Sequence, residues 1–238
     1  MSENTGVDTI RYRYRFTFAD GTEKDFALHL NPSTLELITN KDAVRPEWTR
    51  LKYFQCDNCP LGDEVEYCPV AVNLATLIDA FKDAVSFTTT GMTVEAAERI
   101  YHRETTLQKG LSSIIGIYMV TSNCPVMDKL RPNVRFHLPF ASTEETVYRA
   151  ISMYLTAQYF VMRKGGRPDW GLQNLAEIYK AVAHVNQGIS QRLVHASRED
   201  ANVNAVIILS TFGATLDHFL ENSLNSIEYM FRDYIPPS

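Results

Sequence analysis

The chain has 238 residues, of which 45% are hydrophobic and 21% are charged, and this balance excludes a disordered protein. The formal net charge of −5 excludes the overall basic character of most nucleic-acid-binding proteins. We therefore expect no nucleic-acid partner. A chain of this length forms one large domain or two small ones with a buried core.

The N-terminal residues lack a secretory signal, because no basic start is followed by an apolar run. The longest uncharged stretch, Gly110–Met127, carries too many polar side chains to span a bilayer comfortably. We expect a cytoplasmic protein with no membrane partner, in which cysteine thiols stay reduced.

Residues 11–30, "RYRYRFTFADGTEKDFALHL", predict an antiparallel β-hairpin. Arginines alternate with aromatic residues before Asp20-Gly21, which supplies the tight turn. Glu23 and Asp25 on the returning strand are placed to pair with the arginines. An arginine stripe can also bind phosphate, but pairing across the hairpin satisfies these charges without a ligand.

The middle of the chain contains mixed signals. Helical spacing of apolar residues begins at Cys68, and residues 86–106 look like a second hairpin, in which 96–98 fit a helix equally well. Residues 106–120 predict a buried helix. Residues 131–141 predict an extended segment, because Arg135 and His137 alternate with apolar residues between two prolines.

The C-terminal third predicts helices. Ser142 and Glu145 form a capping box, and the first helix ends at Gly165-Gly166. Two further long helices, within residues 172–231, predict an antiparallel helical hairpin. The second is expected to run about 45 Å, longer than its partner can cover. Its surplus apolar face is covered either within the chain or by a homodimer through these C-terminal helices.

These elements predict an α+β fold. It consists of an N-terminal antiparallel β-hairpin region (1–50), a cysteine-bearing α/β segment (51–140) and a C-terminal antiparallel helical layer (141–238). We expect the three segments to form one compact unit.

Three of the four cysteines lie within "YFQCDNCPLGDEVEYCPV", residues 53–70, and the full spacing is Cys56-x2-Cys59-x8-Cys68-x55-Cys124. A C-x2-C pair offers two thiolates from one turn, as zinc and iron–sulfur sites do. Cys68 and Cys124 each precede a proline, a residue favoured in the first turn of a helix. We therefore expect both at helix N-termini, where the helix dipole favours a thiolate.

The spacing predicts a metal centre held by Cys56, Cys59, Cys68 and Cys124. Zinc is favoured, in a closed structural site, and a [4Fe–4S] cluster is the alternative. The Cys56/Cys59 pair also fits a redox dithiol, and inert buried thiols are the plain alternative. The carboxylates of the same loop should face solvent, because further anions beside thiolates are unfavourable.

The expected function is that of a metal-binding protein that acts through interaction, with a redox protein as the alternative. No catalytic residue and no substrate follow from the sequence, so enzymatic activity is left open. His137, thirteen residues after Cys124, offers a Cys/His nucleophile interpretation, but a histidine on a strand is more often only half exposed.

Overall fold

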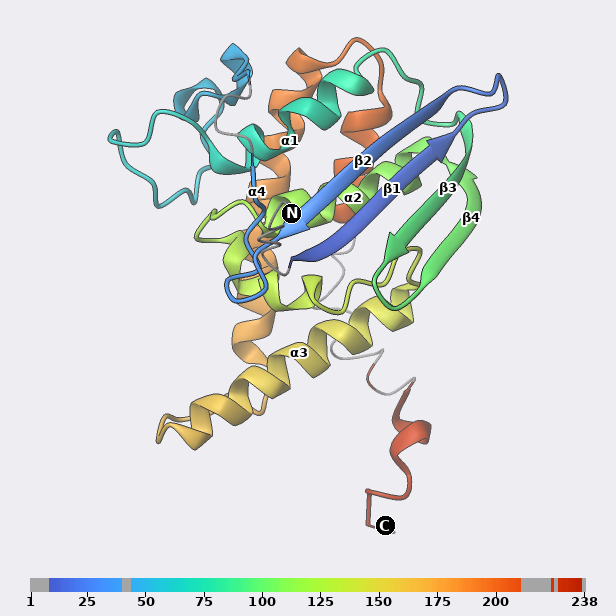
Figure 1. The fold of residues 1–238 in the computed structure, drawn as a ribbon. Helices are drawn as coiled ribbons and strands as arrows, with labels where there is room; N and C mark the ends of the chain where they lie inside the picture. The colour runs from blue at the N-terminus through green and yellow to red at the C-terminus, as the bar shows by residue number, and fades with distance from the viewer. Residues whose placement is uncertain (1–8, 40–43, 211–223, 225–226, 237–238) are drawn as a thin grey trace, which may run out of the picture.

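The computed structural model describes residues 9–39, 44–210, 224 and 227–236. The strands, helices and 3-10 helices (η) are β1 (Ile10–Thr17), β2 (Glu23–Leu30), η1 (Glu47–Thr49), η2 (Leu51–Tyr53), α1 (Pro69–Ala80), β3 (Thr89–Ala96), β4 (Ile100–Thr106), α2 (Leu107–Val120), η3 (Met127–Val134), α3 (Thr143–Arg163), α4 (Gln173–Ala196) and η4 (Glu228–Phe231). Residues 201–210 are also helical. The α+β fold class is confirmed (Figure 1).

The four strands form one antiparallel sheet in the order β2-β1-β3-β4. Both predicted hairpins are present, and they join through β1 and β3. Tyr12, Tyr14 and Phe16 point from β1 into the core. On the other face, Arg13 forms an ion pair with Asp25 at 2.8 Å. The arginine stripe therefore pairs across the hairpin as expected.

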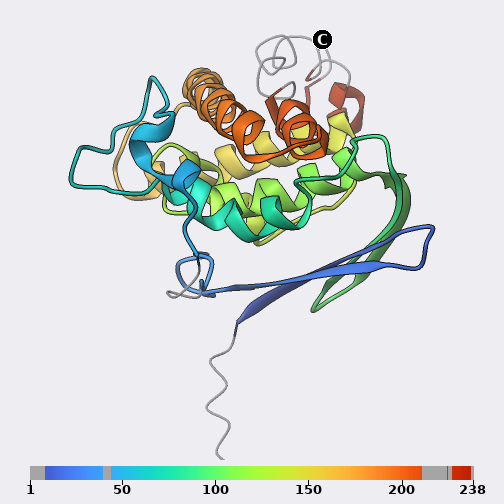
Figure 2. The ribbon, with the colours of Figure 1, turned by 90° about the horizontal axis from the view of Figure 1, so that it is seen from above.

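The helices cover one face of the sheet, which forms a separate layer in Figure 2. α2 follows β4 directly and packs against the sheet at Gly110. A Cβ atom at Gly110 would lie 2.8 Å from Met92 Sδ and 2.9 Å from Phe16 Cε1. The glycine that weakens the helix pattern is thus the point at which helix and sheet make their closest contact.

α3 begins with the predicted capping box. The Glu145 amide donates to Ser142 Oγ at 3.1 Å, and the Ser142 amide donates to Glu145 Oε2 at 2.7 Å. The helix ends before Gly165, whose φ of +77° is left-handed. The buried stripe of α4 includes Leu175, Tyr179, Val182, Asn186, Ile189 and Leu193.

The predicted extended segment at 131–141 is wrong. Its first residues belong to η3, and turns follow. Pro132 lies within η3, where its fixed φ suits a 3-10 turn, and the Tyr12 hydroxyl donates to the Val134 carbonyl at 2.8 Å. The apolar alternation was misleading, because Val134 is buried whereas Phe136 is 78% exposed.

The predicted last helix is described only in part. Its first turns are seen at 201–210, whereas residues 211–223 and 225–226 lie outside the described residues. The predicted apolar positions Phe212, Leu216 and Phe219 fall there, so the helical hairpin stays a prediction.

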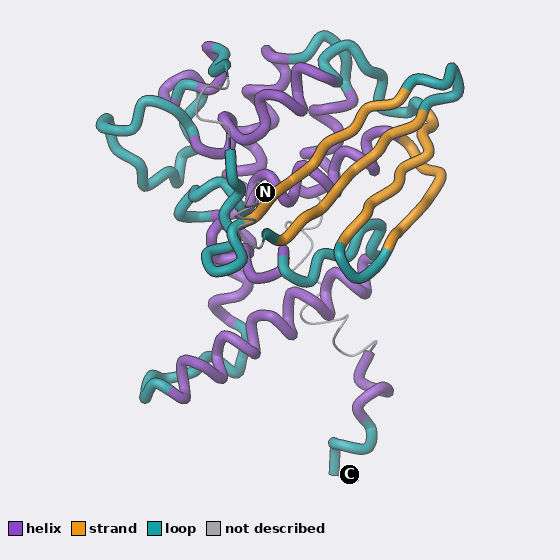
Figure 3. Tube along the Cα trace, viewed as in Figure 1, coloured by secondary structure: helices purple, strands orange, loops and turns teal. Residues whose placement is uncertain are grey.

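Side chains from β1, α1, α2, α3 and α4 belong to one core cluster. The predicted N-terminal, middle and C-terminal segments thus contribute to the same core. Long loops connect β2 to α1 and carry three of the cysteines (Figure 3). Among the helices of the described ranges, none has the length and hydrophobicity needed to cross a bilayer.

Candidate functional site

The first candidate site is built on the cysteine loop, residues 54–67. The loop leaves η2 and returns to α1, and its two ends are joined by a β-bridge between Arg50 and Tyr67. Within it the Cys59 amide donates to the Cys56 carbonyl at 3.0 Å, which closes the tight turn expected of a C-x2-C pair. The backbone therefore presents Cys56 and Cys59 from one turn.

Cys68 is the residue that precedes α1, with Pro69 in the first turn, as predicted. The amides of Val70 and Ala71 lower the pKa of its thiol, although burial raises that pKa more strongly. No hydrogen bond from these amides to the side chain has ordinary capping geometry. The thiol thus lies in the field of the helix N-terminus without capping it.

Cys124 is also placed at the start of a helical segment. Its carbonyl accepts a hydrogen bond from the Asp128 amide at 3.0 Å, one helical turn further on. Burial raises the pKa of its thiol, and the amides of Met127 and Val126 oppose this rise. Cys68 is thus the N-cap residue of α1, as its Cys-Pro pair predicted, whereas Cys124 lies two residues before Val126, the N-cap of η3.

The charges of the four thiols act on one another. Burial, together with the charges of Cys68, Cys59 and Cys124, raises the pKa of Cys56 to about 12, although the positive charge of Arg192 opposes the rise. The Cys124 thiol interacts in the same way with Cys68 and Cys59. All four are free cysteines. Within the part of the chain that the structure describes, however, no group of three or more His, Cys, Asp or Glu side chains is placed so that it could hold a metal ion.

A buried cation lies beside these thiols. Arg192 of α4 is fully buried, and its guanidinium donates to three backbone carbonyls around η1 and η2. Nη1 donates to Trp48 O at 2.7 Å and to Arg50 O at 2.6 Å, and Nη2 donates to Leu51 O at 2.8 Å. The arginine therefore fixes the backbone that leads into the cysteine loop.

The charge of Arg192 acts on the thiols. Burial raises the pKa of both Cys56 and Cys68, and Arg192 opposes the rise by favouring their thiolates. Among the described residues no Asp or Glu forms an ion pair with this guanidinium. Burial of a charge without a counterion is costly, and the three carbonyls that accept hydrogen bonds from Arg192 offset part of that cost.

The carboxylates of the cysteine loop face solvent. Asp57, Asp63, Glu64 and Glu66 are all exposed. Asp63 forms an ion pair with Lys52 at 2.6 Å. Glu66 pairs with Arg50 at 2.8 Å. The expectation that these groups point away from the thiols is confirmed, and no described carboxylate is a candidate ligand.

His137 does not pair with a cysteine. Its Nε2 contacts the Tyr14 hydroxyl and lies 3.4 Å from Ser113 Oγ. Burial and, to a smaller degree, the positive charge of Arg149 lower the pKa of His137 to about 3. A neutral histidine held by a tyrosine does not activate a thiol, so the Cys/His nucleophile interpretation finds no support in the described contacts.

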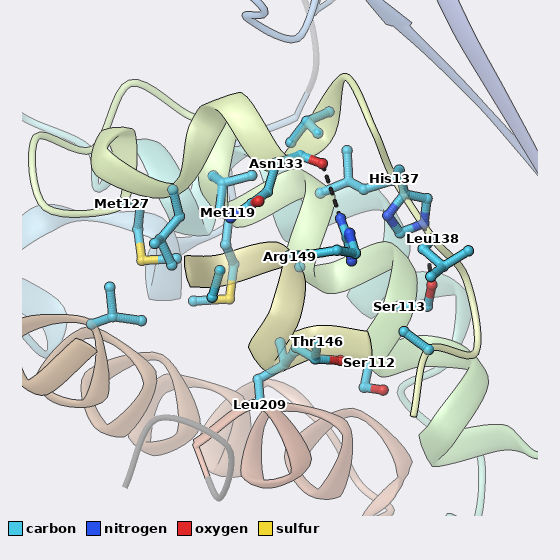
Figure 4. A pocket seen from close by; sticks show the side chains of 18 of the residues that line it. Ser112, Ser113, Met119, Met127, Asn133, His137, Leu138, Thr146, Arg149 and Leu209 are labelled. Atoms are coloured by element: carbon cyan, nitrogen blue, oxygen red, sulfur yellow. Dashed lines mark hydrogen bonds between the residues drawn. The ribbon is translucent and has the colours of Figure 1, made fainter. Parts of the chain in front are cut away.

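The second candidate site is a cavity of about 640 Å³ that sequence reasoning missed (Figure 4). Its walls come from α2, η3, α3, α4 and residues 208–209. The sequence signal was weak, because the polar residues that line it occur singly on separate helices, as Ser113, Arg149 and Asn186 do. Asn186 is a polar residue in the otherwise mostly apolar stripe of α4, and it lines this cavity.

Fold and sites together define an α+β protein with four free cysteines, a buried arginine whose charge acts on two of them, and a separate cavity. Over residues 10–232 the chain matches the family described as "Domain of unknown function (DUF6901)", and it belongs to that family. No curated protein and no solved structure is significantly similar to it.

Proposed function

We propose that this protein is a metal-binding protein in which Cys56, Cys59, Cys68 and Cys124 hold one ion. Zinc is the favoured ion, because four thiolate ligands complete its usual structural coordination. A site closed by four protein ligands leaves no open position for a substrate. The metal would therefore tie the cysteine loop to α1 and η3, and the protein would act through binding or interaction.

The observation that carries the proposal is Arg192. A divalent ion with four thiolates is net negative, and a fully buried guanidinium beside Cys56 and Cys68 offsets that charge. Four neutral thiols would leave the arginine without a compensating charge in the described surroundings. The position of Cys68 at the N-terminus of α1 supports the same conclusion, as do the amides of Met127 and Val126 that lower the pKa of the Cys124 thiol, because such amides favour anionic sulfur.

The proposal requires the four sulfurs to approach one another when the ion binds, since no three of them are placed to hold it in the arrangement described. Cys56 and Cys59 lie on a loop, which adjusts more readily than a helix. Free thiols of this kind belong to a reducing compartment, so the proposal includes a cytoplasmic location.

Metal analysis of the full chain, purified anaerobically, tests the proposal. We expect a colourless protein with about one zinc ion per chain and Co²⁺ spectra typical of thiolate ligands after exchange. Cys68→Ser and Cys124→Ser should each lose most of the bound zinc. Val65→Ala is the matched control: it loosens the same loop without removing a thiol, and it should keep the ion.

Two results would overturn the zinc assignment. A protein that binds no zinc even after refolding in its presence has inert thiols. A brown protein that contains iron and sulfide carries a [4Fe–4S] cluster, which is the redox alternative. Full retention of zinc by Cys124→Ser would reduce the site to three cysteines.

A further inference from the structure

The cavity between α2, η3 and α3 has the features of a site for a small ligand. Its volume of about 640 Å³ lies within the range of pockets that enclose small molecules. Apolar side chains form most of its wall, among them Ile117, Met119, Met127, Leu130 and Leu209. No cysteine lines it, so it is independent of the proposed metal centre.

Arg149 brings a positive charge into this apolar wall. The residue lies on α3, and its guanidinium points among the cavity side chains beside His137 and Asn133 (Figure 4). Nη2 donates to the Asn133 carbonyl at 3.1 Å. Nε is buried and has no hydrogen-bond partner within the described residues. The guanidinium therefore has donors to spare inside the cavity.

Among the described residues no carboxylate forms an ion pair with Arg149, although the charge of Glu145 acts on it from a greater distance. A guanidinium in an apolar wall costs free energy unless an anion pairs with it. Exposed arginines need no such partner, because water screens their charge: Arg135 pairs with Glu98 at 3.9 Å, whereas Arg163 donates to the Tyr159 hydroxyl and forms no ion pair with a carboxylate of the described residues. The missing ion pair matters at Arg149 because its guanidinium lies among the side chains that line the cavity.

The remaining polar groups of the cavity are neutral. His137 is uncharged at neutral pH, because burial lowers its pKa to about 3, and its Nε2 is already engaged by Tyr14. The side chain of Asn186 is only 2% exposed and makes no hydrogen bond to the described residues. One positive charge with neutral donors around it matches a single negative charge, and a phosphate dianion would need further cations.

We propose that this cavity binds an apolar molecule that carries one carboxylate, with the carboxylate paired to Arg149 and the apolar part against Met119, Met127 and Leu209. A guanidinium accepts a carboxylate through two parallel hydrogen bonds. The two methionines are unbranched and adaptable, so this wall suits a flexible hydrocarbon chain better than one rigid shape.

Calorimetric titration of the full chain with decanoate tests the proposal, with 1-decanol as the neutral ligand of equal chain length. We expect decanoate to bind with one-to-one stoichiometry and 1-decanol to bind at least about tenfold more weakly. Arg149→Met should weaken decanoate binding by at least about tenfold and abolish the preference for the acid. Arg163→Met removes an exposed arginine from the same helix and should leave binding unchanged.

Thr146→Trp keeps Arg149 but fills part of the cavity, and it should also weaken decanoate binding. This second variant protects the test against a folding defect in Arg149→Met. Circular dichroism identifies any variant that fails to fold. The proposal is overturned if decanoate does not bind the wild-type chain with this stoichiometry, if 1-decanol binds as tightly, or if both folded cavity variants bind decanoate as the wild type does.

Discussion

Arg192 combines two roles that a single residue seldom has. It donates to three carbonyls of the segment before the cysteine loop, and it places a positive charge beside Cys56 and Cys68. A methionine of similar length fills the same space but supplies neither the hydrogen bonds nor the charge. The two roles are separable, because lysine restores the charge without the planar fork of donors.

We predict that Arg192→Met lowers the free energy of unfolding by about 3 kcal/mol or more, because three buried carbonyls lose their donors. It should also weaken zinc binding, whereas Arg192→Lys should recover part of the affinity and little of the stability. Urea unfolding and competition with a zinc chelator measure the two effects. Arg198→Met, at an exposed arginine, is the control. Equal zinc affinity in Arg192→Met and the wild type would remove the electrostatic support for the metal site.

His137 makes stability depend on pH. Its pKa is about 3 in the folded chain and about 6.5 in the unfolded chain. As the pH falls below about 6.5, the unfolded chain takes up a proton that the folded chain refuses, so stability falls. Between these two pKa values, the free energy of unfolding falls by up to about 1.4 kcal/mol for each pH unit.

His137→Gln should remove this contribution. When the pH is lowered from 6.5 to 5, the free energy of unfolding should fall by about 2 kcal/mol more for the wild type than for the variant. Urea unfolding at both pH values measures the difference. His102→Gln, at an exposed position of β4, controls for the loss of a histidine from the surface. Parallel pH profiles for the wild type and His137→Gln would show that His137 is charged in the fold.

Local chemistry made some of these residues predictable. A proline after Cys68 and Cys124 indicated helix starts, and the C-x2-C spacing indicated a turn, because both signals depend on neighbouring residues. Arg192 and Arg149 carry no such signal. Their roles depend on carbonyls and walls brought near by folding, such as Trp48 O, which is 144 residues away from Arg192.

At the scale of elements, α4 and the cysteine loop meet at Gly188. A Cβ atom there would lie 2.7 Å from Cys56 Sγ, closer than ordinary contact allows. Helix propensity alone favours alanine over glycine by up to about 1 kcal/mol inside a helix. The close contact opposes that preference, so the glycine sets the distance between helix and loop.

We predict that Gly188→Ala displaces Cys56 and fails to stabilise the protein, despite the gain in helix propensity. Gly116→Ala is a matched control in α2, because its Cβ would lie 3.8 Å from Leu209 Cδ2, an ordinary contact. The free energy of unfolding of this control, measured with urea, should rise by up to about 1 kcal/mol. If Gly188→Ala gains as much free energy of unfolding as Gly116→Ala and binds zinc like the wild type, the cysteine loop adjusts freely to the added Cβ atom.

Elements in which apolar residues recur at a regular spacing were predictable from the sequence, whereas elements whose conformation depends on tertiary contacts were not. The hairpin of β1 and β2 and the stripe of α4 follow from spacing alone. The segment at 131–141 lacked a partner strand, which a two-residue alternation cannot reveal. There η3 forms instead, and the hydrogen bond from Tyr12 to Val134 O ties it to the sheet.

At the scale of the whole molecule, the second half of α3 extends away from the sheet layer (Figure 1). Large apolar side chains are exposed along it and in the loop that follows: Tyr159, Phe160, Val161, Met162 and Trp170. An exposed apolar patch of this kind is commonly a contact surface. The sequence left open a homodimer through the C-terminal helices, and α3 offers one such surface among the described residues; η4 and the residues after it offer another, with Tyr229, Met230 and Tyr234 exposed.

We predict that the full chain, of 27.0 kDa, has the mass of a dimer in light scattering at micromolar concentration. The double variant Phe160→Ser, Met162→Ser should shift the mass to that of one chain, because it removes apolar area from the centre of the patch. Phe136→Ser removes an even more exposed aromatic residue outside the patch and should leave the dimer intact. A wild-type mass of one chain would exclude self-association, and a dimer that survives the double variant would place the contact elsewhere.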